Sequence, residues 1–125
     1  MASELRLTTL ANNAGTESVD TTYVINGSAK VWIKFRAYST NTIFDSLNVT
    51  SFTDNGAGNF TVNFNNNMGN AFYSAVAGKW NSGSNTGFAI NCQDNDSSLQ
   101  DVVTFENDTA TDPLACSLAI HGDLA

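Results

Sequence analysis

The ten residues Ser28–Ala37 read SAKVWIKFRA, and their alternation determines the fold class. Positions 29, 31, 33, 35 and 37 are apolar, whereas positions 30, 34 and 36 carry positive charge. A period of two places alternate side chains on opposite faces of a β-strand, so that one face lies in a core and the other in solvent. Trp32 is the exception on the solvent face, where a neighbouring chain, a loop or the stems of Lys30 and Lys34 could cover its ring.

The segment that follows predicts a β-hairpin. Leu47 and Val49 alternate with polar residues before a turn cluster at 54–59 (DNGAGN), and the alternation resumes at 60–64 (FTVNF). Asn-Gly adopts positive φ at low cost and is typical of a hairpin turn. Between Val49 and Phe52 the apolar register slips by one residue, which predicts a β-bulge.

Shorter segments of the same kind occur along the rest of the chain. They are Thr21–Ile25, Ala71–Ala77, Gly87–Cys92, Val102–Glu106 and Cys116–Ile120, with Glu4–Leu10 as an N-terminal edge strand. No window shows helical spacing, and residues 11–20 and 80–86 show no regular pattern. About eight short strands predict one all-β domain over residues 21–125, an antiparallel sandwich or barrel. Residues 1–20 form an N-terminal arm or edge strand, which either reaches a neighbouring subunit or frays.

The composition excludes some classes of protein. Asn, Thr and Ser supply 43 of the 125 residues and only 14% are charged, but 42% are hydrophobic, which is enough for a core and disfavours disorder. The net charge of −7 arises entirely after Lys79, where seven acids occur without Lys or Arg. Such a chain repels phosphate backbones, so we expect no nucleic-acid partner. The preferred interpretation of the acidic part is a solvated face, and a basic partner is the alternative.

The sequence shows no membrane signal, and its cysteines do not form a metal motif. No apolar run approaches a signal-peptide core or a spanning helix, so we expect no membrane partner and synthesis in a cytoplasm. Cys92 and Cys116 are 24 residues apart without a CxxC motif, which does not fit a zinc site. Two buried thiols are the preferred interpretation, and a disulfide between them is the alternative.

Catalytic chemistry finds little support in the residues. Any Ser-His-Asp or Cys-His arrangement would depend on His121, the single histidine. The stretch Asp94-Asn95-Asp96-Ser97-Ser98 resembles the first half of a calcium loop, but Leu99 stands where the loop needs glycine. A solvated acidic turn is therefore the default interpretation. We predict no enzymatic activity, no catalytic residue, no cofactor and no bound metal.

A sheet surface rich in Asn, Thr and Ser suits two purposes. It can pack against copies of itself in a polar interface, or it can bind sugars through hydroxyl and amide groups beside aromatic platforms. The candidate platforms are Trp32, Trp80, Tyr38 and Tyr73. The sequence does not place these rings on one surface.

Three stretches carry a resemblance to a known domain. They read SAKVWIKF at 28–35, DSLNVTSFTDNGAGNFTVNFNNNM at 45–68 and SLAIHGD at 117–123. Together they resemble a small β domain that recurs in structural proteins of tailed bacteriophages, described as tail-fibre or virion proteins. The domain's turn and strand pattern, Asp-Asn-Gly-X-Gly followed by (Phe/Tyr)-Thr-Val-Asn-Phe, matches residues 54–64 closely. The resemblance covers residues 26–77 well, the last strand weakly and residues 1–23 hardly at all.

The resemblance implies a non-enzymatic virion component that is made in the bacterial cytoplasm and works as a homo-oligomer, with a trimer favoured. A chain of 125 residues leaves little room for a fibre shaft, so the resemblance favours a capsid decoration (cement) protein bound to the major capsid protein. The alternative is a small tail-fibre or spike subunit that joins a tail protein and binds a host-surface receptor or glycan. In both cases many weak contacts would add through avidity.

Overall fold

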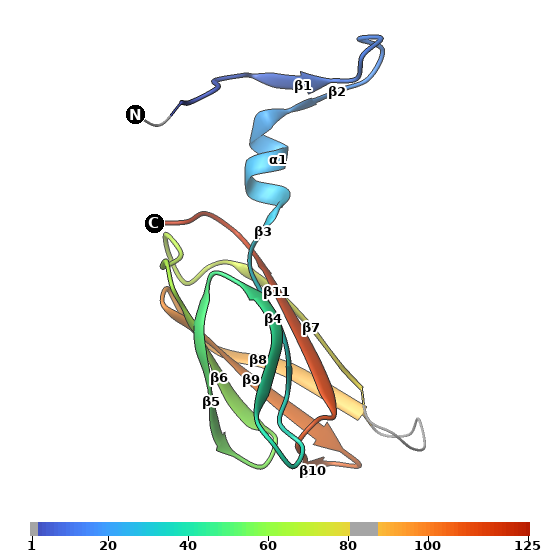
Figure 1. Cartoon of the computed structure of the whole chain (residues 1–125), viewed down its shortest axis with the longest axis vertical. Helices are drawn as coiled ribbons and strands as arrows, with labels where there is room; N and C mark the ends of the chain where they lie inside the picture. The colour runs from blue at the N-terminus through green and yellow to red at the C-terminus, as the bar shows by residue number, and fades with distance from the viewer. Residues whose placement is uncertain (1–2, 81–87) are drawn as a thin grey trace.

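The computed structural model describes residues 3–80 and 88–125, and it shows a β-sandwich with an arm that projects from one end (Figure 1). The strands pair in antiparallel fashion throughout. The prediction of an all-β fold is confirmed, and of the two architectures expected the structure is a sandwich and not a closed barrel.

The first sheet contains the alternating stretch from which the fold class was predicted. Its strands, in the order β4-β3-β11-β7, are β4 (Thr42–Leu47), β3 (Ala29–Arg36), β11 (Ala115–His121) and β7 (Ser74–Trp80). On β3 the apolar side chains Val31, Ile33 and Phe35 are buried, as the period of two predicts. Trp32, Lys34 and Arg36 therefore belong to the outer face of this sheet.

The second sheet contains the predicted hairpin. It is formed by β5 (Val49–Gly56), β6 (Asn59–Phe64), β8 (Phe88–Asp96), β9 (Leu99–Glu106) and β10 (Thr109–Ala110). Strands β5 and β6 pair around the turn at Ala57-Gly58, and β9 pairs with β6, β8 and β10. The register of β5 shifts between Val49 and Ser51, which confirms the predicted bulge.

The core lies between the two sheets and is centred on three phenylalanines. The ring centroid of Phe35 on the first sheet lies 4.8 Å from that of Phe52 and 5.5 Å from that of Phe60 on the second. Tilted and edge-to-face ring pairs of this kind contribute about 0.5–1.5 kcal/mol each beyond the area they bury. A second ring pair, Phe64 with Tyr73, lies at a centroid distance of 6.0 Å.

The arm corrects two predictions. It consists of β1 (Thr9–Ala11), β2 (Ser18–Asp20) and the helix α1 (Thr21–Gly27). The strand predicted over Thr21–Ile25 is wrong, because these residues form α1, and the sandwich begins at Ala29 instead of residue 21. Four of the five residues are β-branched, which favours strands. The helix forms because the Asp20 carboxylate caps it by accepting a hydrogen bond from the Thr22 N–H at 2.7 Å.

Smaller differences concern strand number and extent. The described residues form eleven strands where about eight were expected, because β1, β2 and β10 are very short and β4 lacks clear alternation. Of the predicted edge strand Glu4–Leu10, only the last two residues pair, and their partner β2 lies within the segment 11–20 that was expected to be irregular. Trp80 ends β7, and the rest of the irregular segment predicted at 80–86 lies outside the described residues.

Gly58, in the β5–β6 turn, is a position where the fold requires glycine. Its φ is +67°, and an added Cβ would lie 2.4 Å from the Thr104 carbonyl oxygen and 2.5 Å from the Thr111 nitrogen. Gly56 in the same hairpin also has positive φ, but it has open space around it. Its φ is +129°, which L side chains rarely adopt, so backbone strain alone predicts a loss of about 1–3 kcal/mol for Gly56→Ala.

We therefore expect Gly58→Ala to lower the free energy of unfolding by about 4 kcal/mol or more, since backbone atoms must move as well. Urea unfolding of the two variants side by side measures the difference. Equal losses for both would contradict the tight packing described at Gly58.

Candidate functional site

Hydrogen bonds give the arm a defined shape. The Thr21 N–H donates to the Thr8 carbonyl at 2.9 Å, and the Thr21 hydroxyl donates to the Leu7 carbonyl at 2.8 Å. The Asn12 side chain closes the turn between β1 and β2, where it accepts from the Thr16 N–H and donates to the Thr16 hydroxyl, both at 3.0 Å. The hairpin and the helix therefore hold together without contributing to the core of the sandwich.

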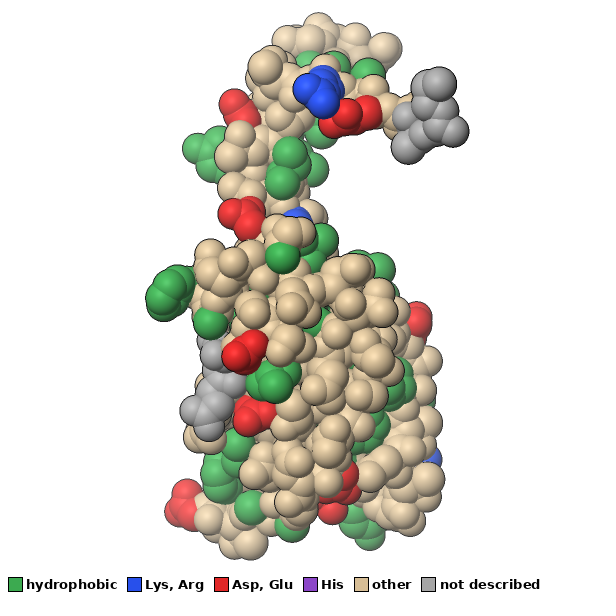
Figure 2. Space-filling model, turned by 90° about the vertical axis from the view of Figure 1, so that its left-hand side faces the viewer, with side chains coloured by type: hydrophobic (Ala, Val, Ile, Leu, Met, Phe, Trp, Pro, Cys, Tyr) green, Lys and Arg blue, Asp and Glu red, His purple; other side chains and the backbone are tan. Residues whose placement is uncertain are grey.

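The apolar side chains of the arm are uncovered. Leu5 is 82% exposed, Tyr23 75% and Ile25 60%, and no residue of α1 is buried. Figure 2 shows hydrophobic side chains along the narrow neck between the arm and the body of the molecule. Five apolar side chains of the arm line one hollow between the N-terminal residues and α1: Leu5, Leu7, Leu10, Val24 and Ile25. A helix of seven residues is marginal on its own hydrogen bonds, and its uncovered apolar side chains make the arm a candidate packing surface.

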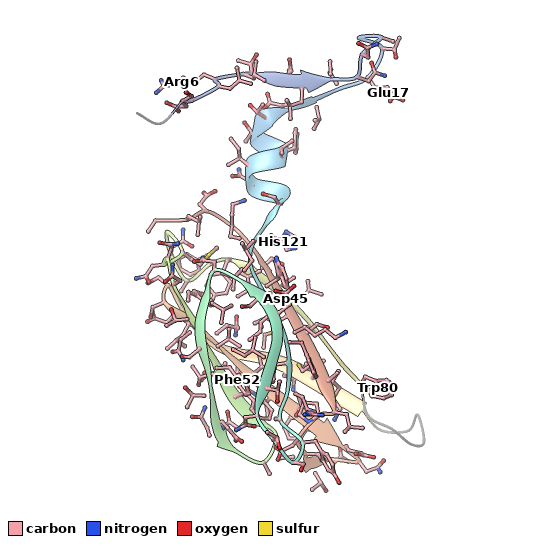
Figure 3. All side chains as sticks on the ribbon, viewed as in Figure 1. Arg6, Glu17, Asp45, Phe52, Trp80 and His121 are labelled. Atoms are coloured by element: carbon pink, nitrogen blue, oxygen red, sulfur yellow. The ribbon has the colours of Figure 1, made fainter. Side chains whose placement is uncertain are left out.

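The junction of the arm with the sandwich is held at the carboxyl end of α1. The Lys30 ammonium donates to the carbonyls of Ile25 and Ser28, and His121 Nδ1 lies 2.9 Å from the Gly27 carbonyl oxygen. Figure 3 shows His121 at this junction. A positive charge at the carboxyl end of a helix is favoured by the helix dipole. Any Ser-His-Asp or Cys-His arrangement would need His121, the single histidine. In the structure its side chain lies at the junction between the arm and the sandwich.

The outer face of the first sheet carries a groove that follows β11. Its floor consists of small residues, because Ala115, Ser117 and Ala119 alternate along β11 and Gly78 lies opposite Ser117 on β7. Aromatic side chains form its walls. Trp32 pairs in register with Ala119, and Trp80 pairs with Ala115 at the other end. This surface, together with Phe44, Lys34 and Arg36, is the aromatic groove referred to below.

Two cations project into the aromatic groove without a carboxylate partner. Lys34 and Arg36 lie on β3, and neither forms a salt bridge with a carboxylate of the described residues. The guanidinium of Arg36 lies 5.8 Å from the ring centroid of Phe44, and its buried Nε has no hydrogen-bond partner. Asp45 pairs with Lys34 in the strand register but forms no ion pair with it. Both positive charges are therefore available to a ligand.

The outer face of the second sheet has the opposite character, because its polar side chains bond one another. The Asn63 amide donates to the hydroxyls of Ser51 and Thr53 at 3.2 and 3.3 Å. On the same face the Thr61 hydroxyl donates to the Asp101 carboxylate at 2.5 Å and accepts from the Asn55 amide at 2.8 Å. Much of the hydrogen-bonding capacity of this polar ladder is therefore already used within the sheet.

The structure brings together two of the four predicted aromatic platforms. Trp32 and Trp80 line the aromatic groove, whereas Tyr38 is exposed beyond the end of β3 and does not line it. Tyr73 is buried, and its hydroxyl donates to the carbonyls of Leu99 at 2.6 Å and Asp96 at 3.1 Å. Burial, with a smaller contribution from Asp96, raises the pKa of Tyr73 to about 12. Phe44, a further ring of the groove, had no signal in the sequence, because it lies where β4 shifts register against β3.

Both cysteines are free thiols, as the preferred interpretation had it, although Cys92 is only half-buried. Burial raises the pKa of Cys116 to about 12, and burial also raises the pKa of Cys92. Cys116 is thus protonated at neutral pH and acts as an apolar packing group.

The acidic turn is organised by its own serines. The Asp96 carboxylate accepts hydrogen bonds from the Ser98 N–H and hydroxyl, both at 3.0 Å, and these bonds lower the pKa of Asp96. The side chain of Asp94, the other acid of the calcium-like stretch, lies outside the described residues. Within the described part of the chain no three His, Cys, Asp or Glu side chains gather as a metal site.

Comparison with known proteins adds no relative. No family model, curated protein sequence or solved structure matches this chain. Among the residues described, no helix combines the length and apolar character needed to span a membrane. The uncovered arm and the aromatic groove are the two candidate sites within the described part of the molecule.

Acid is expected to weaken the helix of the arm. The hydrogen bond from the Thr22 N–H lowers the pKa of Asp20 below its usual 3.8. Because the folded-state pKa is depressed, the cap contributes fully above the unfolded pKa and is lost as the pH falls through the lowered value. We expect the ¹³Cα shifts of residues 21–27 to move toward coil values in that range.

Two substitutions check this role of Asp20. Asn keeps an oxygen acceptor, so Asp20→Asn should retain the helical shifts and lose their pH dependence below 3.8. Asp20→Ala removes the acceptor and should shift the same resonances toward coil at every pH. Helical shifts that persist unchanged in Asp20→Ala would contradict the capping role.

Proposed function

We propose that the protein is a non-enzymatic structural component of a tailed-bacteriophage particle, a capsid decoration protein that assembles as a homotrimer through its N-terminal arm. The main support for assembly is the arm, which projects from the sandwich with its apolar side chains uncovered (Figures 1 and 2). The resemblance of residues 26–77 to a phage virion domain supports the place in a particle. Neighbouring arms and the major capsid protein are the proposed partners.

The energetics favour contacts between arms. Burying a Leu, Val or Ile side chain is worth about 1.5–3 kcal/mol, and five apolar side chains line the hollow of each arm. The arm lies at one end of an elongated molecule, so that several arms can converge while their sandwiches spread apart. Closed cyclic assembly covers every copy of such a surface equally, which an open chain of subunits does not.

In this proposal, binding to the capsid depends on many identical copies of the protein. Each copy offers a modest surface to the capsid, and linked copies bind with an avidity that no single contact reaches. The polar ladder on the second sheet is bonded within itself and keeps that face compatible with water. Assembly in this proposal needs only the arm and leaves the aromatic groove open.

A second candidate function has its own observation. The aromatic groove collects Trp32, Trp80 and two unpaired cations on an exposed sheet. A small tail-fibre or spike subunit would use such a groove to bind a host-surface receptor or glycan, with the arm anchoring it to the tail. In this case the protein would lie at the tail and not on the capsid.

Charge placed in the arm should separate the subunits. The double variant Leu10→Glu/Ile25→Glu puts two carboxylates into the hollow, and their desolvation opposes packing. We expect light scattering at micromolar concentration to give the mass of three chains for the wild type and of one for the variant. Val76→Glu, 62% exposed on the sandwich, is the control and should remain trimeric. A wild-type monomer, or a trimer in the double variant, would contradict arm-mediated assembly.

Cryo-electron microscopy of intact particles tests the place of the protein. Density for the sandwich on the capsid lattice supports decoration. Density at the tail supports the second candidate. Particles that lack the protein altogether would rule out both.

A further inference from the structure

We propose that the aromatic groove binds an acidic oligosaccharide, whose sugar rings lie on the two tryptophans and whose carboxylates meet Lys34 and Arg36. The inference deepens the second candidate function, receptor binding, by naming the class of ligand and the residues that recognise it. It does not depend on assembly through the arm, because the groove lies within one sandwich.

The floor of the groove allows a flat ligand to approach. Ala115, Ser117 and Ala119 alternate on the outer side of β11, and Gly78 faces Ser117 from β7. These side chains are short, whereas the flanking positions carry the large rings of Trp32 and Trp80. At about 3.3 Å per residue, the floor from Ala115 to Ala119 extends about 13 Å, which makes the groove elongated and suits a chain of sugar rings.

Both tryptophans of the chain lie at this groove. Trp80 is 63% exposed, and Figure 3 shows it at the end of β7. Indole rings combine a large apolar face with a negative π surface, and sugar rings present C–H groups that pack against such faces. Placing the two rings at either end of a floor of small residues provides two stacking positions along one ligand.

The charges of the groove select an acidic ligand. The chain has a net charge of −7, yet Lys34 and Arg36 have no carboxylate partner within ion-pair distance. Asp45 pairs with Lys34 in the strand register without neutralising it. A carboxylated sugar complements these two cations through charge-assisted hydrogen bonds.

A peptide fits the groove less well than a sugar. Extended peptides gain affinity from backbone hydrogen bonds at an open sheet edge. The floor of this groove is β11, an inner strand that pairs with β3 on one side and β7 on the other. Its backbone groups are therefore used within the sheet, and what remains for a ligand is ring faces, the Ser117 hydroxyl and the two cations.

The test uses the full chain, a polygalacturonate oligosaccharide and the same oligosaccharide with its carboxylates methyl-esterified. Because both tryptophans lie at the groove, binding should change their fluorescence. We expect saturable binding of the acidic form that weakens with added salt, and at least tenfold weaker binding of the esterified form.

Variants with matched controls locate the binding site. Trp80→Ala should weaken binding of the acidic oligosaccharide at least tenfold by calorimetry, and Lys34→Gln and Arg36→Gln should each weaken it severalfold and reduce its salt dependence. Phe72→Ala removes an exposed ring outside the groove, and Arg6→Gln removes one positive charge from the arm. Both control variants should bind as the wild type does.

Several outcomes would overturn the proposal. They are the absence of saturable binding, equal binding of the esterified form, equal losses in the control variants, or equal affinity for a poly-glutamate peptide. The last result would identify the groove as a docking site for acidic peptides. None of these results would alter the mass measured by light scattering or the position in the particle, so failure of the glycan site can be distinguished from failure of assembly or of the virion role.

Discussion

The contact of Phe35 with Phe52 and Phe60 joins the two sheets, and the rest of the molecule is arranged around it. Strand β3 must turn Val31, Ile33 and Phe35 inward to make this core. Because side chains alternate along a strand, the same requirement turns Trp32, Lys34 and Arg36 outward. The chemistry of the aromatic groove is thus fixed in part by the demands of the core on the other face of the same strand.

The outer faces of the two sheets expose different kinds of side chain to water. On the second sheet, Asn, Ser and Thr side chains bond one another across β5 and β6, and from β6 to β9. On the first sheet, large rings and unpaired cations surround a floor of small residues. The hydrogen-bonding residues of the second sheet thus bond largely to one another. The first sheet therefore holds the surface whose side chains are free to contact a ligand. The arm adds a second such surface at the end of the molecule.

Local patterns predicted the parts of the fold that depend on local physics. The alternation of β3, the hairpin turn within residues 54–59 and the bulge after Val49 could all be recognised, because periodicity and turn chemistry act within a few residues. Helix α1 could not be recognised in this way, because its β-branched residues favour a strand. The cap by Asp20, which supports the helix, is a single hydrogen bond that periodicity does not reveal. The groove could not be recognised either, since Trp80 joins Trp32 only through the pairing of β11 with both β3 and β7.

The last residues of the chain return to the end of the sandwich from which the arm projects (Figure 1). There Leu124 bridges to Met68, and the Ala125 N–H donates to the Asn67 carbonyl at 2.9 Å. The β9–β10 turn lies at the far end of the sandwich, where Asn107 and Asp108 are exposed and take positive φ. A foreign peptide inserted at this turn would therefore extend from the end of the sandwich opposite to the arm.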